Sequence, residues 1–136
     1  MSLPADVARE RVLNRHGAVV DGIDACADAI SSPWTDESTA VRGAVTEPFR
    51  ACLETTGLLA RLPSVLEDAV EATGHGLAAP PVAAPPYVVV TSRGPILRAT
   101  IDPGRLVLRF EAFDVVRESE PRYRRLEETR VTVSLE

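Results

Sequence analysis

Apolar residues, with one histidine among them, recur every three or four positions through the first part of the chain. The repeating positions are Val12, His16, Val19, Ile23, Cys26 and Ile30. This period places them on one face of an α-helix, so the pattern predicts a single helix over residues 4–31 with an apolar seam. Gly17 and Gly22 each weaken that helix by ~1 kcal/mol relative to alanine, so packing of the seam must hold it.

A second helix is predicted over residues 35–62, folded back against the first at Ser31–Pro33 to form a helical hairpin. Its apolar face would hold Val41, Val45, Cys52, Thr56 and Leu59. Because a proline inside a helix removes one hydrogen bond, we expect a kink or break near Thr46–Pro48. Pro63 is then expected to begin a short third helix that ends at Gly74. The apolar face of this helix would hold Val65, Leu66, Ala69 and Val70.

After residue 86 the apolar repeat changes to every second position, which is typical of strands. The predicted strands are Tyr87–Ser92, Ile96–Ile101, Arg105–Arg117 and Tyr123–Leu135. Their short connections predict an antiparallel meander. The alternation shifts after Phe110, which predicts a β-bulge near Ala112–Asp114.

The two patterns meet at a proline-rich segment, where Ala-Ala-Pro-Pro occurs twice, separated by Val82. Paired prolines favour an extended, stiff linker. We therefore expect a helical region over 1–76, a linker over 77–86 and a sheet region over 87–136, and a length of 136 residues suits one compact domain. The predicted fold class is α+β: a helical hairpin with a short third helix, followed by a four-stranded antiparallel β-meander.

All fifteen basic residues are arginine, and the chain has no lysine. This composition, with a pI near 5.1, indicates either a G/C-rich genome or a cytoplasm with molar salt. Residues 1–74 carry six arginines and twelve acidic residues, whereas residues 87–136 carry nine and eight. No apolar run approaches the ~18 residues that span a bilayer, and no basic stretch precedes an apolar one at the start. We expect a cytoplasmic protein without a membrane partner.

The two cysteines, Cys26 and Cys52, both lie on predicted apolar faces. In a straight hairpin they would be roughly 18 Å apart along the helix axes, which excludes a disulfide and predicts buried free thiols. The same geometry would bring His16 near Cys52, as in a nucleophile and base pair. No group that would stabilise an oxyanion is evident, so we favour a core histidine bonded to a polar neighbour such as Thr56.

Three aspartates, Asp21, Asp24 and Asp28, are spaced to share a helix face beside the seam. Such a cluster could bind a hard cation. A solvent-exposed acidic helix face is the more common interpretation, and we favour it. His16 and His75 are the only histidines, and their spacing from the cysteines matches no zinc site. The sequence therefore assigns no catalytic, cofactor-binding or metal-binding residue.

The only basic cluster is Arg122-Tyr123-Arg124-Arg125, and three further arginines are expected on adjacent strands. Those three are Arg98, Arg105 and Arg109. Arginines and an aromatic ring on a sheet can contact nucleic acid. Acidic residues flank the cluster, namely Glu118, Glu120, Glu127 and Glu128. Cross-strand arginine–carboxylate pairs are thus favoured over nucleic-acid binding.

Over residues 85–95, and again at Arg98-Ala99 and 104–107, the sequence resembles a group of small haloarchaeal proteins of unknown function. The resemblance is strongest in the C-terminal half, and the helical half matches by pattern and composition. It implies a halophilic archaeal origin. It carries over no activity, cofactor or catalytic residue.

The first functional hypothesis is a non-enzymatic interaction or assembly protein, because a helical seam or the edge of a small open sheet could bury a second copy. One alternative is a small-ligand-binding or enzymatic domain with a pocket between helices and sheet. Another is nucleic-acid binding through the arginine-bearing sheet. The expected partner is a second copy or another protein, and nucleic acid is the least favoured.

Overall fold

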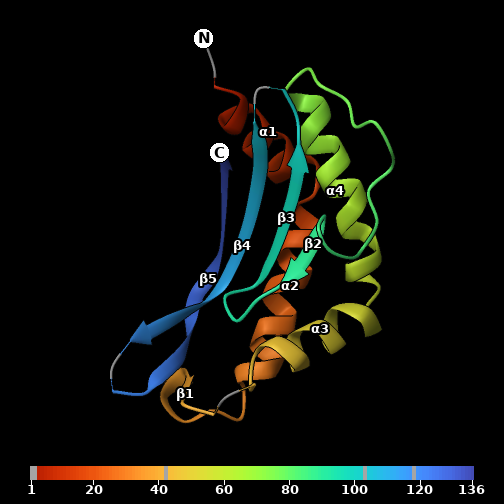
Figure 1. Ribbon diagram of the computed structural model, residues 1–136. Helices are drawn as coiled ribbons and strands as arrows, with labels where there is room; N and C mark the ends of the chain where they lie inside the picture. Colours follow the sequence, from red (N-terminus) through yellow and green to blue (C-terminus); the bar gives the residue numbers. More distant parts are fainter. Residues whose placement is uncertain (1–2, 42, 103, 118) are drawn as a thin grey trace.

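The computed structural model describes residues 3–41, 43–102, 104–117 and 119–136. Over these residues an antiparallel five-stranded sheet has one face covered by helices (Figure 1). The strand order is β1-β5-β4-β3-β2. The strands are β1 (Ser38–Thr39), β2 (Val88–Val90), β3 (Pro95–Thr100), β4 (Arg105–Arg117) and β5 (Pro121–Leu135). The α+β class is confirmed, with the four predicted strands as β2–β5 and a short fifth strand, β1, that the sequence did not predict.

Among the described residues four α-helices form the second layer, and a 3₁₀ turn at Thr35–Glu37 precedes β1. The helices are α1 (Pro4–Arg15), α2 (Gly17–Ser31), α3 (Thr46–Thr55) and α4 (Leu58–Ala72). None of the helices in the described segments has the length and apolar content needed to cross a bilayer.

The hydrophobic core lies between the two layers and draws on both. Helix α3 contributes Phe49, β4 contributes Phe110 and Phe113, and all three rings are fully buried. The helical seam faces this core: Val12, Val19, Ile23 and Cys26 are each at most 2% exposed. The seam is therefore covered by the chain itself, and a second copy is not needed to bury it.

The predicted first helix is divided in two at His16, which leaves helical geometry with φ −123° and ψ 27°. Its N–H still bonds to the carbonyl of Val12 and closes α1, while Gly17 begins α2. Glycine is a weak helix former, so the chain can turn here at low cost. The break lets α1 pack on α4 while α2 packs on the sheet.

The predicted second helix is wrong over residues 35–45, because this segment forms the 3₁₀ turn, β1 and a loop. Asp36 and Glu37 adopt positive φ, and Val41, expected on the apolar face, is 64% exposed. The break predicted near Thr46–Pro48 is confirmed as the start of α3, where a proline in the first turn has no helical acceptor to lose.

Helix α4 begins earlier than the predicted third helix, and Pro63 lies inside it. Gly57, with φ 80°, separates α3 from α4 in a conformation that glycine adopts easily. The predicted apolar face from Val65 to Val70 is buried, and the helix ends before Gly74, as predicted. The proline-rich segment then runs along α4 back to β2, with Leu77 and Ala83 packed against the core (Figure 1).

The predicted irregularity in β4 is confirmed, but the extra residues lie on β5. Glu111 pairs with Arg130, whereas Phe113 pairs with Arg125. Residues 126–129 of β5 thus stand opposite the single residue Ala112 of β4. The sequence placed the shift correctly, but it could not show which strand carries the insertion.

Replacing Gly94 with alanine should destabilise the fold by about 2–3 kcal/mol, because Gly94 adopts φ 144° and a Cβ there would meet the carbonyl oxygen of Phe110. Gly17→Ala is the matched control, since no atom lies within 4 Å of its added Cβ. It should leave stability unchanged or raise it by up to ~1 kcal/mol. Urea unfolding compares the two variants, and equal midpoints would contradict the assignment.

Candidate functional site

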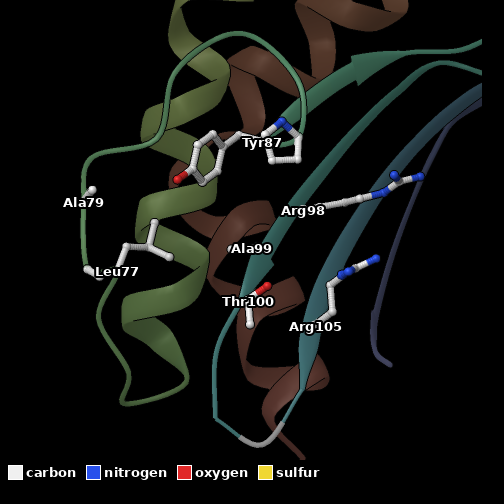
Figure 2. A pocket seen from close by; sticks show the side chains of 9 residues that line it. Leu77, Ala79, Tyr87, Arg98, Ala99, Thr100 and Arg105 are labelled. Atoms are coloured by element: carbon white, nitrogen blue, oxygen red, sulfur yellow. The ribbon is translucent and has the colours of Figure 1, made fainter.

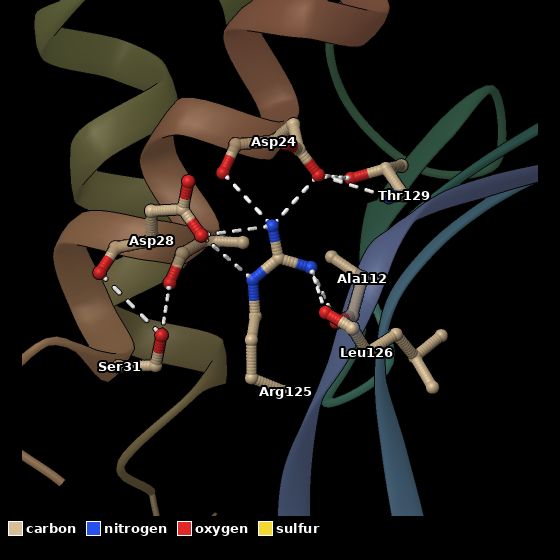
Figure 3. Close-up of polar contacts among 8 residues, drawn as sticks. Asp24, Asp28, Ser31, Ala112, Arg125, Leu126 and Thr129 are labelled. Atoms are coloured by element: carbon tan, nitrogen blue, oxygen red, sulfur yellow. Dashed lines mark hydrogen bonds and ion pairs between the residues drawn. The ribbon is translucent and has the colours of Figure 1, made fainter. Parts of the chain in front are cut away.

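The most heavily bonded side chain in the described structure is Arg125, whose side chain is 4% exposed (Figure 3). It lies at the β5 irregularity and points toward α2. Its Nη2 donates to Asp24 Oδ1 at 2.7 Å and to the Asp24 carbonyl at 3.2 Å, and its Nε donates to Asp28 Oδ1 at 3.2 Å. Its Nη1 donates to the carbonyls of Ala112 and Leu126. All five guanidinium N–H groups are therefore used.

Asp24 completes the connection between helix and sheet by accepting two further bonds from Thr129. Partial burial acts to raise the pKa of the Asp24 carboxyl, but the hydrogen bonds from Arg125 and Thr129 outweigh it and hold that pKa below its ordinary value. Beneath the guanidinium, the ring of Phe113 lies 5.9 Å away from the Arg125 Cζ. Arg125 and its two aspartate partners thus form an ionic connection between the helical layer and the sheet.

This geometry changes two expectations from the sequence. Asp24 and Asp28 do not form a purely solvated face with Asp21, because they bind a buried arginine. Within the described residues no cluster of ligands suited to a metal ion is present. The basic cluster is divided as well, since Arg125 points into the protein while Arg122 donates to Ser38 on β1.

Asp24→Asn should lower the free energy of unfolding at pH 7 by about 2–3 kcal/mol, because it replaces the closer of the two carboxylates that pair with the buried guanidinium by a neutral amide. Since the folded-state pKa of Asp24 is lowered, its contribution is complete above the ordinary value of 3.8 and is lost as pH falls through the folded pKa. The difference from wild type should therefore narrow in acid. Asp21→Asn on the same helix is the control and should change stability by less than ~0.5 kcal/mol. Equal losses of stability for Asp24→Asn and Asp21→Asn in urea titrations would contradict the role of Asp24 as a partner of Arg125.

Cys26 on α2 and Cys52 on α3 are neighbours, and both thiols are free. Burial and the adjacent Cys52 thiol raise the pKa of Cys26 to about 12. The expected separation of roughly 18 Å for a straight hairpin is wrong, because residues 35–45 are not helical and the chain reaches α3 through a loop. Thr56, expected beside His16, instead lies 3.9 Å from Cys26 Sγ through its Oγ1.

In the folded protein, iodoacetamide at pH 8 should modify Cys52 and leave Cys26 unmodified. Cys52 is half-buried, whereas Cys26 is 2% exposed and its raised pKa leaves almost no thiolate. Peptide mass mapping over time measures both sites, and the urea-unfolded chain is the control in which both should react. Equal labelling of the folded protein would show that the thiol environments are misassigned.

His16 lies at the break between α1 and α2 and bonds to α4. Its Nε2 is 2.9 Å from Asp68 Oδ2, and Arg11 Nη1 is 2.9 Å from Asp68 Oδ1. Burial acts to raise the pKa of Asp68, but bonds from His16 and Arg11 and the charges of Arg11 and Arg15 outweigh it and lower that pKa. The partner of His16 is thus Asp68 rather than Thr56, and its role is to hold the helix break against α4.

Arg98, Arg105 and Arg109 do lie on adjacent strands, as predicted, on the sheet face opposite the helices. Their orientation follows from the alternation along β3, where Leu97 and Ala99 face the core. Arginine–carboxylate pairs do occur on the sheet: Arg109 pairs with Glu136 at 2.9 Å and Arg93 with Asp114 at 2.8 Å. Among the described residues, however, no ion pair uses the flanking acids Glu120, Glu127 and Glu128. Glu118, one of the predicted flanking acids, lies outside the described residues.

A groove of about 340 Å³ lies between the proline-rich segment and β3 (Figure 2). Leu77, Ala79 and Tyr87 form one side of it. The side chains of Arg98 and Arg105 run from the strands over β4, away from Leu77 and Ala79. Because charged groups do not converge in this groove, it offers little to a reaction mechanism.

The feature with the clearest capacity to bind is the open edge of β5. Strand β1 covers only Tyr123 and Arg124, so beyond them the described chain places no strand on that side. Arg105 and Glu136 exchange both backbone hydrogen bonds. In an antiparallel ladder alternate residues face the neighbour, so the N–H and C=O groups of residues 131, 133 and 135 point outward. The bond from Arg9 Nε to the carbonyl of Val131, at 2.8 Å, agrees with this direction.

Apart from Arg9 at the Val131 carbonyl, this edge lacks the features that usually prevent strand pairing. Residues 131–135 read Val-Thr-Val-Ser-Leu, without charge or proline. A second groove, of about 580 Å³, runs between β5 and helices α1 and α2. Its lining includes Leu13, which is 40% exposed, and Val20. The groove adjoins the open edge at Val131, which belongs to both.

The fold defines a two-layer α+β protein with an antiparallel sheet open on one face. The chain belongs to the family DUF7988, a domain of unknown function, whose model matches residues 6–136. Neither the curated proteins nor the solved structures contain a significant match to the chain. The expected membership of a family of unknown function is thus confirmed, while a haloarchaeal origin stays a prediction.

Proposed function

We propose that this protein is a non-enzymatic assembly protein that forms a homodimer by pairing the β5 strands of two copies. The observation that carries the proposal is the uncharged open edge at residues 131–135. Unpaired edge groups are a template for another strand, and natural sheets commonly protect them with charge, proline or a covering segment. Here the described edge groups are met only by Arg9, at the Val131 carbonyl.

With a two-fold axis at Val133, the outward N–H and C=O groups of the β5 edge form hydrogen bonds in both copies. Val133 then pairs with its counterpart, and Val131 pairs with Leu135 of the second copy, because these residues carry the outward N–H and C=O groups. The two sheets would become one continuous sheet with helices on the same side. The bond from Arg9 would be exchanged for one from the second copy.

The other surfaces are less suited to self-association. The helical seam, one of the two initial reasons to expect assembly, is buried within the chain. The opposite edge strand, β2, has three residues and lies beside the returning proline-rich segment. The edge of β5 is therefore favoured because it is both longer and open.

Val133→Pro should convert a dimer into a monomer, because it removes an outward N–H without removing a bond to β4. Val133→Thr retains the N–H and is the matched control, so it should remain dimeric. Light scattering measures the mass in low salt and in molar salt, the latter because the composition is consistent with a halophile. Circular dichroism checks that both variants are folded. A wild type that stays monomeric at every salt and protein concentration would overturn the proposal.

The register in which the two β5 strands pair can be tested separately. With the axis at Val133, Thr132 of one copy faces Ser134 of the other as a non-hydrogen-bonded pair, with Cα atoms about 4.5 Å apart, within disulfide reach. A mixture of the Thr132→Cys and Ser134→Cys variants should therefore cross-link on mild oxidation. Each variant alone should cross-link poorly, because its cysteines lie two positions out of register. Equal cross-linking in all three samples would exclude this register.

A further inference from the structure

Three arginines surround one position on the face of the sheet that no helix covers. Arg98 on β3 is the direct cross-strand partner of Val107 on β4. Arg105 and Arg109 lie two residues to either side of Val107 on the same strand, so each is a diagonal neighbour of Arg98, about 7–8 Å away at Cα. The register thus places three arginines around Val107.

The exposure of Val107 shows that these side chains lie flat. Val107 is 1% exposed, yet it is not part of the core cluster between sheet and helices. It is the middle residue of the outward set Arg105, Val107 and Arg109. Arg98 and Arg105 run over β4 in Figure 2. The aliphatic parts of arginines can cover apolar surface while their charged ends stay in water.

The charges of this cluster are only partly balanced within the described residues. Arg109 Nη2 lies 2.9 Å from Glu136 Oε2, and its Nη1 donates to Ser134 Oγ at 3.0 Å. Arg98 and Arg105 have no ion pair or side-chain hydrogen bond in the part of the chain that the structure describes. Gathering like charges on neighbouring strands is unfavourable, and a bound anion would relieve it.

We infer that the cluster of Arg98, Arg105 and Arg109 binds the phosphate groups of a small phosphorylated molecule. The guanidinium group matches phosphate oxygens with paired N–H donors. Thr100, directly opposite Arg105 on the same face, adds a hydroxyl donor.

The size of the cluster favours a small ligand over a nucleic-acid strand. Next along β4, Glu111 pairs across the strands with Arg130, so the excess positive charge ends there. Two further arginines of the sheet, Arg122 and Arg124, lie beyond the β5 irregularity beside β1. A polymer backbone would need a continuous basic track, and the chain as a whole carries a net charge of −5.

The arginine cluster is separate from the proposed dimer interface, because the cluster lies on the face of the sheet and the interface lies at the β5 edge. The test titrates inorganic pyrophosphate and inorganic phosphate into the full chain by calorimetry at constant ionic strength. Saturable binding is expected. The Arg98→Gln/Arg105→Gln variant should bind pyrophosphate at least about tenfold more weakly, since it loses charge-assisted bonds. Arg98→Gln alone should show an intermediate loss.

Two exposed arginine changes elsewhere provide the matched control. Arg61→Gln/Arg15→Gln alters net charge equally on the helical layer and should leave pyrophosphate affinity unchanged. Equal weakening in both double variants would overturn the site, as would the absence of pyrophosphate and phosphate binding by wild type. A single-stranded RNA that binds more tightly than pyrophosphate, through the same two arginines, would overturn the small-molecule assignment in favour of nucleic acid.

Discussion

The buried guanidinium of Arg125 determines how the helical layer and the sheet fit together. Its five N–H groups reach α2, β4 and its own strand, so one side chain specifies the relative position of three segments. A buried charge is costly unless its hydrogen bonds are complete, and the observed register of β5 completes them. The connection thus acts mainly as a constraint on geometry.

That constraint explains why β5 behaves as two different strands. Before the irregularity, Tyr123 and Arg124 pair with β1 on one side and with β4 on the other. Residues 126–129 then leave the regular ladder, and Thr129 bonds to Asp24 on α2. After that point the strand returns to β4 alone. The open edge at 131–135 therefore follows directly from the place where α2 holds the strand.

The sequence predicted the fold class and the long strands because apolar alternation is a local signal that the core requires. Leu106, Leu108 and Phe110 are all fully buried. It failed at residues 35–45, where Val41 and Val45 suggested a helix although positive φ values and a two-residue strand occur there. It also could not join Asp24 to Arg125, which lie 101 residues apart. Each charged residue alone has the pattern of a solvated surface, and only tertiary packing brings them together.

The fold explains where the charges of the acidic helical half and the arginine-rich sheet half lie. The acidic residues of the helical half lie mostly on the outer surface of the helical layer, and some of them neutralise arginines at the helix junctions, as Asp68 does for Arg11. The sheet half has no helices on its second face, so arginines in the middle of β3 and β4 must face water or a ligand. Strand pairing at β5 uses backbone groups in the plane of the sheet, whereas the arginine side chains lie over its uncovered face. Since the two surfaces do not share atoms, a second copy at the edge would enlarge the cationic face without covering it.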